Sequence, residues 1–170
     1  MSGPDFVSQR VANLVGFAAC AGLMGYALYA EHVLHLEPCP LCIFQRIAVI
    51  AIGIVFLLAA LQDAKPVGSR VYAGLIVLAA GAGSAVAMRH LWIQSLPADK
   101  VPACGAPLDQ LMQLLPLRNV IETVLRGDGE CAKANWKFLG LAMPAWVLIA
   151  CVALALWGLY FNLRRPSRRV

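Results

Sequence analysis

Hydrophobic residues in this chain gather into four long runs, which cover about residues 11–30, 41–61, 71–88 and 139–161. Each run is near the roughly 20 residues that a helix needs to cross the hydrocarbon core of a bilayer. Because backbone polar groups in lipid must be hydrogen-bonded internally, such runs are expected to be helices. The pattern therefore predicts an all-α integral membrane protein, in which a four-transmembrane-helix bundle forms a single membrane domain over residues 1–170.

Polar residues between these runs predict two outer loops of unequal length, about 31–40 and 89–138. The first loop holds no Lys or Arg, whereas the connection after the second run carries Asp63, Lys65 and Arg70. Basic residues favour the cytoplasmic side of a membrane. We therefore expect both termini in the cytoplasm and both of these loops on the outer side.

The second outer loop has helical periodicity of its own. Apolar residues recur at helical spacing on both sides of Pro116, as Leu108, Leu111, Met112 and Leu115 before it and as Leu117, Val120, Ile121, Val124 and Leu125 after it. Because proline interrupts a helix, the pattern predicts two short amphipathic helices or one kinked helix. Packing on the bundle and lying in the outer membrane surface are compatible interpretations of this loop.

Small residues mark the third run, which carries Gly74, Gly81, Gly83 and Ser84 among alanines. Such residues let helix backbones approach closely. We therefore expect the third helix to pack against its neighbours rather than to face lipid. Pro144 falls in the first turn or two of the fourth helix, where proline is best tolerated.

Composition and charge agree with a membrane protein. Hydrophobic residues make up 61% of the 170 residues, against about 45–50% in soluble domains. The formal net charge is +5, and four arginines cluster near the C-terminus: Arg164, Arg165, Arg168 and Arg169. Beside an apolar run, such a cluster indicates an anchor at cytoplasmic lipid headgroups. We expect a lipid bilayer as a partner and no nucleic acid.

Six cysteines divide by their surroundings. Cys20 and Cys151 lie inside apolar runs, where a free cysteine is commonly a small buried hydrophobe, so we expect inert packing residues. The other four lie in the outer loops or at the outer end of a run: Cys39, Cys42, Cys104 and Cys131.

The Cys39–Cys42 pair is a poor structural staple, because a bridge across so short a loop removes little entropy from the unfolded chain. CxxC spacing is typical of a reactive dithiol, and unpaired N–H groups at the start of the second helix favour a thiolate there. The Cys104–Cys131 pair would close a loop of 26 intervening residues, so a structural disulfide is plausible for that pair alone.

Arg46 follows Cys42 by four residues and shares a helix face with both cysteines of the CxxC. An arginine about one turn inside a span needs a partner, which makes it a functional candidate, although it could also extend towards the outer headgroups. His90 is expected just past the end of the third helix, beside Arg89. A solvated interface histidine and a proton donor at the outer rim both remain open for it.

A metal site is an alternative for the four loop cysteines with His32, His35 and His90. Zinc sites commonly use two CxxC-type pairs, or one pair with spaced histidines. Here the second pair is split by 26 residues, and His32 and His35 do not form a usual ligand pair with the CxxC. We therefore expect no metal.

Taken together, these features resemble the DsbB family of membrane thiol:quinone oxidoreductases. The resemblance covers nearly the whole chain, from the four spans to the CxxC at the end of a short first outer loop and the separated cysteine pair in a long second one. Its local matches are Glu37-Pro38-Cys39-Pro40-Leu41-Cys42, Gln45-Arg46, Gly129-Glu130-Cys131, Trp136-Lys137-Phe138-Leu139-Gly140-Leu141, Met143-Pro144 and Trp146.

The resemblance implies a quinone as cofactor, either ubiquinone or menaquinone. Cys39 and Cys42 match the pair that passes electrons to the quinone, with Cys42 contacting its ring. Arg46 matches the arginine that supports the quinone and favours the thiolate, and His90 matches a histidine near the quinone site. The implied location is the bacterial inner membrane, with the cysteine pairs in the periplasm.

The resemblance also implies a periplasmic DsbA-like thiol oxidase as partner. Cys104 and Cys131 match the pair that oxidises this partner, and Cys104 would be attacked by its thiolate. Released Cys131 would then attack the Cys39–Cys42 disulfide, so that a transient inter-loop disulfide, expected between Cys39 and Cys131, links the pairs. The long loop must move in this cycle, and the glycines of the 127–129 stretch provide a flexible point.

Two other interpretations remain. A quinone reductase of the vitamin K epoxide reductase type also has paired outer cysteines, but its CxxC lies late in the chain, whereas here the CxxC opens the second span. A non-enzymatic membrane subunit with structural disulfides is the other. A Cys39→Ser variant separates these classes, because a structural protein should lose only modest stability and a relay should lose all turnover.

Overall fold

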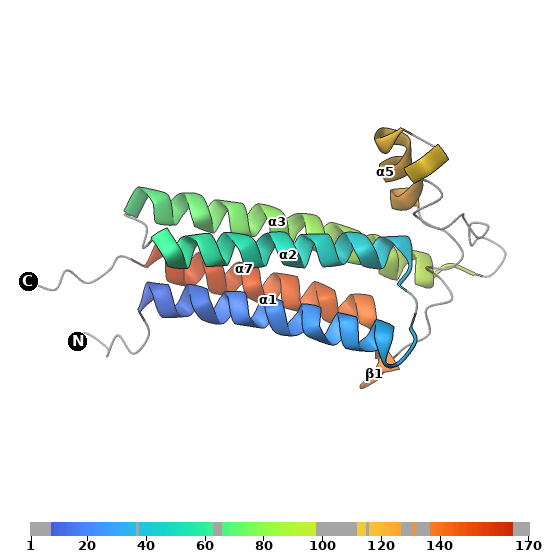
Figure 1. Ribbon diagram of the computed structural model, residues 1–170, viewed down its shortest axis with the longest axis horizontal. Coiled ribbons are helices and arrows are strands. Elements are labelled where there is room, and N and C mark those ends of the chain that lie inside the picture. Colours follow the sequence, from blue (N-terminus) through green and yellow to red (C-terminus); the bar gives the residue numbers. More distant parts are fainter. Residues whose placement is uncertain are drawn as a thin grey trace, which may run out of the picture.

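The computed structural model describes residues 8–36, 38–62, 66–97, 112–114, 116–126, 131 and 137–164. Its main elements are four helices that run side by side (Figure 1): α1 Gln9–His32, α2 Pro40–Gln62, α3 Pro66–Gln94 and α7 Met143–Leu163. Each helix is long and apolar enough to cross a membrane. The predicted all-α fold with four spans is confirmed, and the start of α1 and the end of α7 lie at the same end of the bundle (Figure 1).

Helix α3 extends beyond the apolar run 71–88 at both ends. The placement of His90 just past this helix was therefore wrong, because His90 lies within its last two turns. Arg89 and His90 lower the local hydropathy, but neither residue type prevents the backbone from continuing as a helix. The extension carries His90 beyond the apolar run on a rigid element.

Helix α7 begins later than the apolar run 139–161, because a short hairpin precedes it. Strands β1 Lys137–Phe138 and β2 Leu141–Ala142 pair antiparallel. Between them, Leu139 and Gly140 have φ values of 51° and 81°, as a type I′ turn requires at its two central positions. Pro144 then occupies the first turn of α7, as expected.

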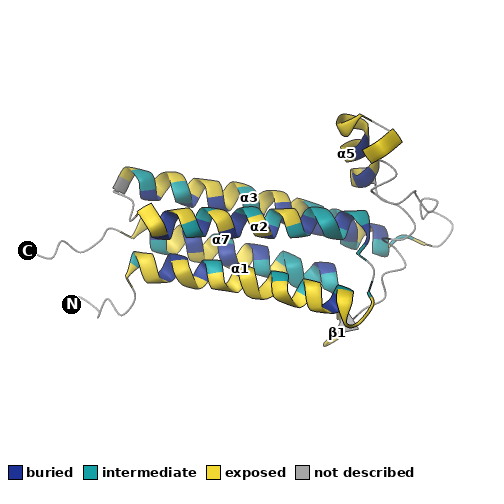
Figure 2. Cartoon of the chain, in the orientation of Figure 1, coloured by how far each residue is buried: buried dark blue, intermediate teal, exposed yellow. Residues whose placement is uncertain are grey.

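The bundle has an apolar core and an apolar outer surface. Buried residues lie along the helix faces that turn towards neighbouring helices, and exposed residues cover the outward faces (Figure 2). The core cluster comprises Cys20, Val49, Ile52, Phe56, Ile76, Ala80, Cys151 and Leu154. Cys20 and Cys151 are thus buried packing residues. Outward leucines such as Leu78 and Leu156 are largely exposed, which suits a lipid environment.

The small residues of α3 have different roles. A Cβ atom at Gly83 would lie 3.0 Å from both the Cβ of Ala48 and the Sγ of Cys151, so this glycine permits close approach to α2 and α7. Positions Gly74 and Gly81 face open space. The expectation that the third helix packs against its neighbours is therefore confirmed, at Gly83 among other positions, whereas Gly74 and Gly81 do not contribute to it because they lie on the outward face.

A short amphipathic helix, α5 Leu117–Arg126, lies to the side of the bundle at the end where α2 begins (Figure 1). Val120 and Val124 are buried, whereas Leu117 and Ile121 remain exposed. Residues 112–114 are also helical, on the other side of Pro116. The predicted amphipathic segment after Pro116 is confirmed, while Leu108, Leu111 and Leu115 lie outside the described residues.

Candidate functional site

The CxxC occupies the N-terminus of α2. Cys39 directly precedes the helix, and its carbonyl oxygen accepts hydrogen bonds from the backbone N–H groups of Cys42 at 2.9 Å and Ile43 at 3.2 Å. The Cys42 N–H also donates to Sγ of Cys39 at 3.4 Å. Pro40 is the first helical residue, a position where a missing N–H costs no intrahelical bond. The local sequence thus places Cys39 where a side-chain cap would lie.

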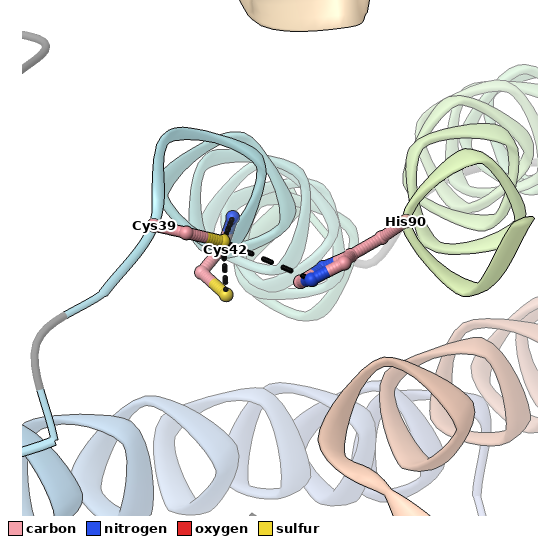
Figure 3. Close-up of side chains that lie close together, drawn as sticks. All are labelled: Cys39, Cys42 and His90. Atoms are coloured by element: carbon pink, nitrogen blue, oxygen red, sulfur yellow. Dashed lines mark hydrogen bonds between the residues drawn. The ribbon is translucent and has the colours of Figure 1, made fainter. Parts of the chain in front are cut away.

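The two sulfur atoms of this pair lie 3.0 Å apart, and the Cys39 thiol donates to Sγ of Cys42 (Figure 3). Both are thiols in this structure. Their environments differ, because Cys39 is only 6% exposed whereas Cys42 is half-buried. Cys42 is therefore the more exposed residue of the pair, although it still packs against the buried cluster that contains Cys39.

His90 reaches from α3 towards this pair (Figure 3). Its Nε2 lies 3.9 Å from Sγ of Cys39 and 3.1 Å from the backbone carbonyl oxygen of Cys131. The side chain is fully buried, at 0% exposed. His90 therefore connects the CxxC with the second outer loop.

Gln45 orients this imidazole, and Gln94 donates to the same backbone carbonyl as His90 does. The Gln45 side-chain nitrogen lies 3.2 Å from Nδ1 of His90. With this nitrogen as donor, Nδ1 is the acceptor, and the ring proton resides on Nε2, which donates to the Cys131 carbonyl. Nε2 of Gln94 donates to the same carbonyl at 3.4 Å. Gln45 of α2 thus positions the His90 ring, and Gln94 of α3 helps to hold the Cys131 carbonyl beside it.

Cys131 packs at the same place. It is 1% exposed and belongs to a buried cluster with Cys39, Leu41, Ile93, Val120 and Val124. A cysteine about 90 residues downstream is therefore a neighbour of Cys39. Its predicted partner, Cys104, lies outside the described residues.

Arg46 lies one turn deeper on α2 than Cys42. Its guanidinium donates to the Glu31 carboxylate and, at 3.2 Å, to the carbonyl oxygen of Ala27. These groups on α1 supply the partners that an arginine inside a span needs. These contacts hold the Arg46 side chain against α1, near the CxxC.

Sequence reasoning did not select Glu31, Gln45 or Gln94. Two of them carried a usable signal. A short loop between antiparallel spans places Glu31 at a depth similar to that of Arg46, and Gln45 is a polar residue within an apolar run. Gln94 had no such signal, because its contact depends on how the second loop folds.

Comparison with known proteins identifies a family that matches most of this chain. The family described as "Disulfide bond formation protein DsbB" matches residues 9–161. "Disulfide bond formation protein B" of Marinobacter nauticus is 50% identical over 95% of this chain and 96% of that protein. The protein of the same description from Xanthomonas axonopodis pv. citri is 48% identical over 94% and 95%. That from Chromobacterium violaceum is 48% identical over 94% and 96%.

Proposed function

The chain belongs to the DsbB family of thiol:quinone oxidoreductases, and we propose that it performs the family's reaction, reoxidation of DsbA with quinone, through Cys104, Cys131, Cys39 and Cys42. The burial of Cys131 in one cluster with Cys39, with His90 in contact with both residues, supports this route most directly. It brings a cysteine of the second loop to the CxxC and leaves Cys42 as the more exposed residue of the pair.

In the proposed cycle, a thiolate of the reduced DsbA-like partner attacks Cys104 of a Cys104–Cys131 disulfide and releases Cys131 as a thiolate. Cys131 attacks Cys39, forms the Cys39–Cys131 disulfide and releases Cys42. The partner's second thiol then frees Cys104, which attacks Cys131 and releases Cys39. Each step is thiolate attack on a disulfide sulfur. The partner ends oxidised, and two electrons reside on the Cys39–Cys42 dithiol.

His90 and its glutamines contribute to the exchange between the pairs. The hydrogen bonds from His90 and Gln94 to the Cys131 carbonyl hold that backbone beside Cys39. This lowers the entropic cost of bringing the two reacting sulfurs together. A role near the quinone was implied for His90 by resemblance. Its buried position on the Cys39 side favours a role in disulfide exchange.

Cys42 and Arg46 are the residues that fit the quinone. Cys42 is half-buried, so an acceptor can approach its sulfur, and Arg46 presents a cation one turn deeper on the same helix. Quinone held beside Cys42 and Arg46 would supply the two-electron oxidation that restores the Cys39–Cys42 disulfide, and it would take up the two protons of the dithiol. Glu31 holds the Arg46 guanidinium in place.

The proposed setting follows from the bundle. The four candidate spans make a multi-pass membrane protein, and the family is one of the bacterial inner membrane. The CxxC lies at the end opposite the first turn of α1 and the last turn of α7 (Figure 1). We infer that this end faces the periplasm, where a DsbA-like partner would reach it.

Quinone reduction by the purified protein tests the proposal. The protein would be supplied with a reduced DsbA-like dithiol and with ubiquinone or menaquinone, as wild type, Cys39→Ser and Cys104→Ser. We expect wild type to consume one of the quinones and both variants to stop. An inactive wild type with both quinones, alongside normally folded variants, would mean that the cysteines are structural or metal-binding.

A further inference from the structure

Cys39, Cys42 and His90 form a compact set of three soft or borderline donors. Their ligand atoms all lie within 4.8 Å of one another, with the two sulfurs 3.0 Å apart and Nε2 of His90 3.9 Å from Sγ of Cys39. All three side chains point into the same space from α3 and the start of α2 (Figure 3).

These distances are close to those of a zinc site with two cysteines and one histidine. Zn–S bonds of about 2.3 Å and Zn–N bonds of about 2.0 Å place tetrahedral ligand atoms roughly 3.5–3.8 Å apart. The Cys39–His90 distance of 3.9 Å nearly meets this. The sulfurs, at 3.0 Å, would have to separate by less than about 1 Å, and Sγ of Cys42, which lies within 4.8 Å of the His90 ligand atom, would have to stay close to the imidazole.

The surroundings of His90 support a metal-bound state. Metal ligation through Nε2 moves the ring proton to Nδ1, which then needs an acceptor. The Gln45 amide is 3.2 Å away and presents its oxygen if it turns over. The Cys131 carbonyl would lose the His90 donor but keep the Gln94 contact.

The local charge does not oppose a cation. Arg46 is the cation one turn below Cys42, and its guanidinium is paired with the Glu31 carboxylate. Two thiolates would therefore meet a divalent ion without a bare positive charge beside them.

Contrary to the expectation of no metal from the sequence, we propose that the reduced Cys39–Cys42 pair, together with His90, binds a thiophilic metal ion such as Zn²⁺, and that the disulfide form does not. Binding releases the two thiol protons and transfers no electrons. The disulfide has no thiolate to offer, so oxidation of the pair and metal binding exclude each other. The ion is thus an inhibitor that traps the reduced state. This inhibition, but not the binding itself, rests on the proposed function.

Binding is tested on full-length, quinone-free protein that has been reduced without oxygen and separated from the reductant. Zn²⁺ is titrated against a chromogenic chelator, and Co²⁺ is used as a spectroscopic probe. We expect one ion per chain and a cobalt–thiolate charge-transfer band for the reduced protein, and neither for the oxidised protein. The His90→Gln variant should bind more weakly by roughly tenfold or more.

Two variants control for misfolding and for binding by the core thiols. His90→Gln keeps a donor for the Cys131 carbonyl, and its thermal unfolding is compared with wild type to confirm folding. A Cys20→Ala/Cys151→Ala variant removes the core thiols and should bind as wild type does. Unchanged affinity in His90→Gln, equal binding by oxidised protein, loss of binding in the core variant, or no binding by reduced wild type would each overturn the proposal.

Measurements of quinone turnover distinguish failure of the metal site from failure of the proposed function. Zn²⁺ added during quinone reduction should lower the rate, and a chelator should restore it. Stoichiometric, His90-dependent binding to a protein that never reduces quinone would uphold the metal site and reject the oxidoreductase cycle. Turnover that proceeds normally at Zn²⁺ concentrations that saturate the reduced protein would overturn the inhibitory role.

Discussion

The backbone carbonyl of Cys131 accepts a hydrogen bond from Nε2 of His90 across 3.1 Å. This bond fastens a residue of the second outer loop to the rigid helix α3. The same Nε2 lies 3.9 Å from Sγ of Cys39. One imidazole therefore fixes the distance between the two cysteines that the proposed cycle joins.

Removal of His90 should slow formation of the Cys39–Cys131 disulfide. In a Cys42→Ser/Cys104→Ser variant, these are the two cysteines left at the site, and the disulfide between them can be trapped by a mild oxidant and followed by gel shift. Loss of a buried hydrogen-bond partner costs about 1–3 kcal/mol, so His90→Ala should slow trapping by roughly tenfold.

His90→Gln serves as the matched control, because its amide can still donate to the Cys131 carbonyl. It should restore part of the trapping rate. Equal rates in all three proteins would show that His90 does not position Cys131, and a residual effect on quinone turnover would then point to a role elsewhere.

Gln45 should act through His90. A Gln45→Leu variant keeps the side-chain volume similar but leaves Nδ1 without its partner in a buried site. We expect trapping to slow by a smaller factor than in His90→Ala, and the double variant His90→Ala/Gln45→Leu to be no slower than His90→Ala alone. Additive effects of the two substitutions would mean that Gln45 acts independently of the imidazole.

Arg46 and Glu31 should affect quinone rather than disulfide exchange. Arg46→Ala removes the cation beside Cys42, so KM for quinone should rise while a single round of disulfide transfer from the protein to its reduced partner, measured without quinone, stays unchanged. Glu31→Gln should act in the same direction but weakly, because a partly exposed ion pair contributes about 0.2–1 kcal/mol, or up to roughly fivefold.

An exposed arginine at the other end of the bundle, Arg70, offers a control for loss of positive charge. Arg70→Ala should leave both measurements as in wild type. If Arg46→Ala slows disulfide transfer as much as quinone reduction, Arg46 stabilises the whole site rather than quinone binding alone.

Burial predicts an order of thiol reactivity. In the reduced, quinone-free protein, Cys42 is half-buried, whereas Cys39 and Cys131 are 6% and 1% exposed. A membrane-permeable alkylating reagent should therefore modify Cys42 before Cys39 and Cys131, as read by mass spectrometry of the peptides. Preferential labelling of Cys39 over Cys42 would contradict the order of exposure within the pair.

The sequence was sufficient for the spans and for the CxxC at the start of α2, because hydropathy and spacing are local properties. It was not sufficient for contacts between helices. Glu31 with Arg46 and Gln45 with His90 depend on the rotation of each helix about its axis, and a run that is apolar on all sides gives no face to orient. The same ambiguity explains why Gly83, but not Gly74 or Gly81, turned out to lie at an interface.

The closeness of α1 and α7 to the core should make Gly16 and Gly158 intolerant of a side chain. A Cβ atom at Gly16 would lie 2.8 Å from the Phe56 ring, and one at Gly158 would lie 2.8 Å from Ile76 and 3.2 Å from Phe56. Overpacking of a filled core costs about 1–3 kcal/mol, so Gly16→Ala should lower the thermal unfolding temperature in detergent. Gly22→Ala is the matched control on the same helix, because its Cβ would meet nothing within 4 Å.

Phe56 provides the decisive comparison for this prediction. Phe56→Leu alone should destabilise the bundle by leaving a cavity, but in its presence the added methyl group of Gly16→Ala finds space. The double variant should therefore be more stable than the sum of the two single effects, by a coupling of about 0.5–3 kcal/mol. Strict additivity, or a loss of stability in Gly22→Ala as large as in Gly16→Ala, would show that helix α1 does not approach Phe56 as closely as the structure places it.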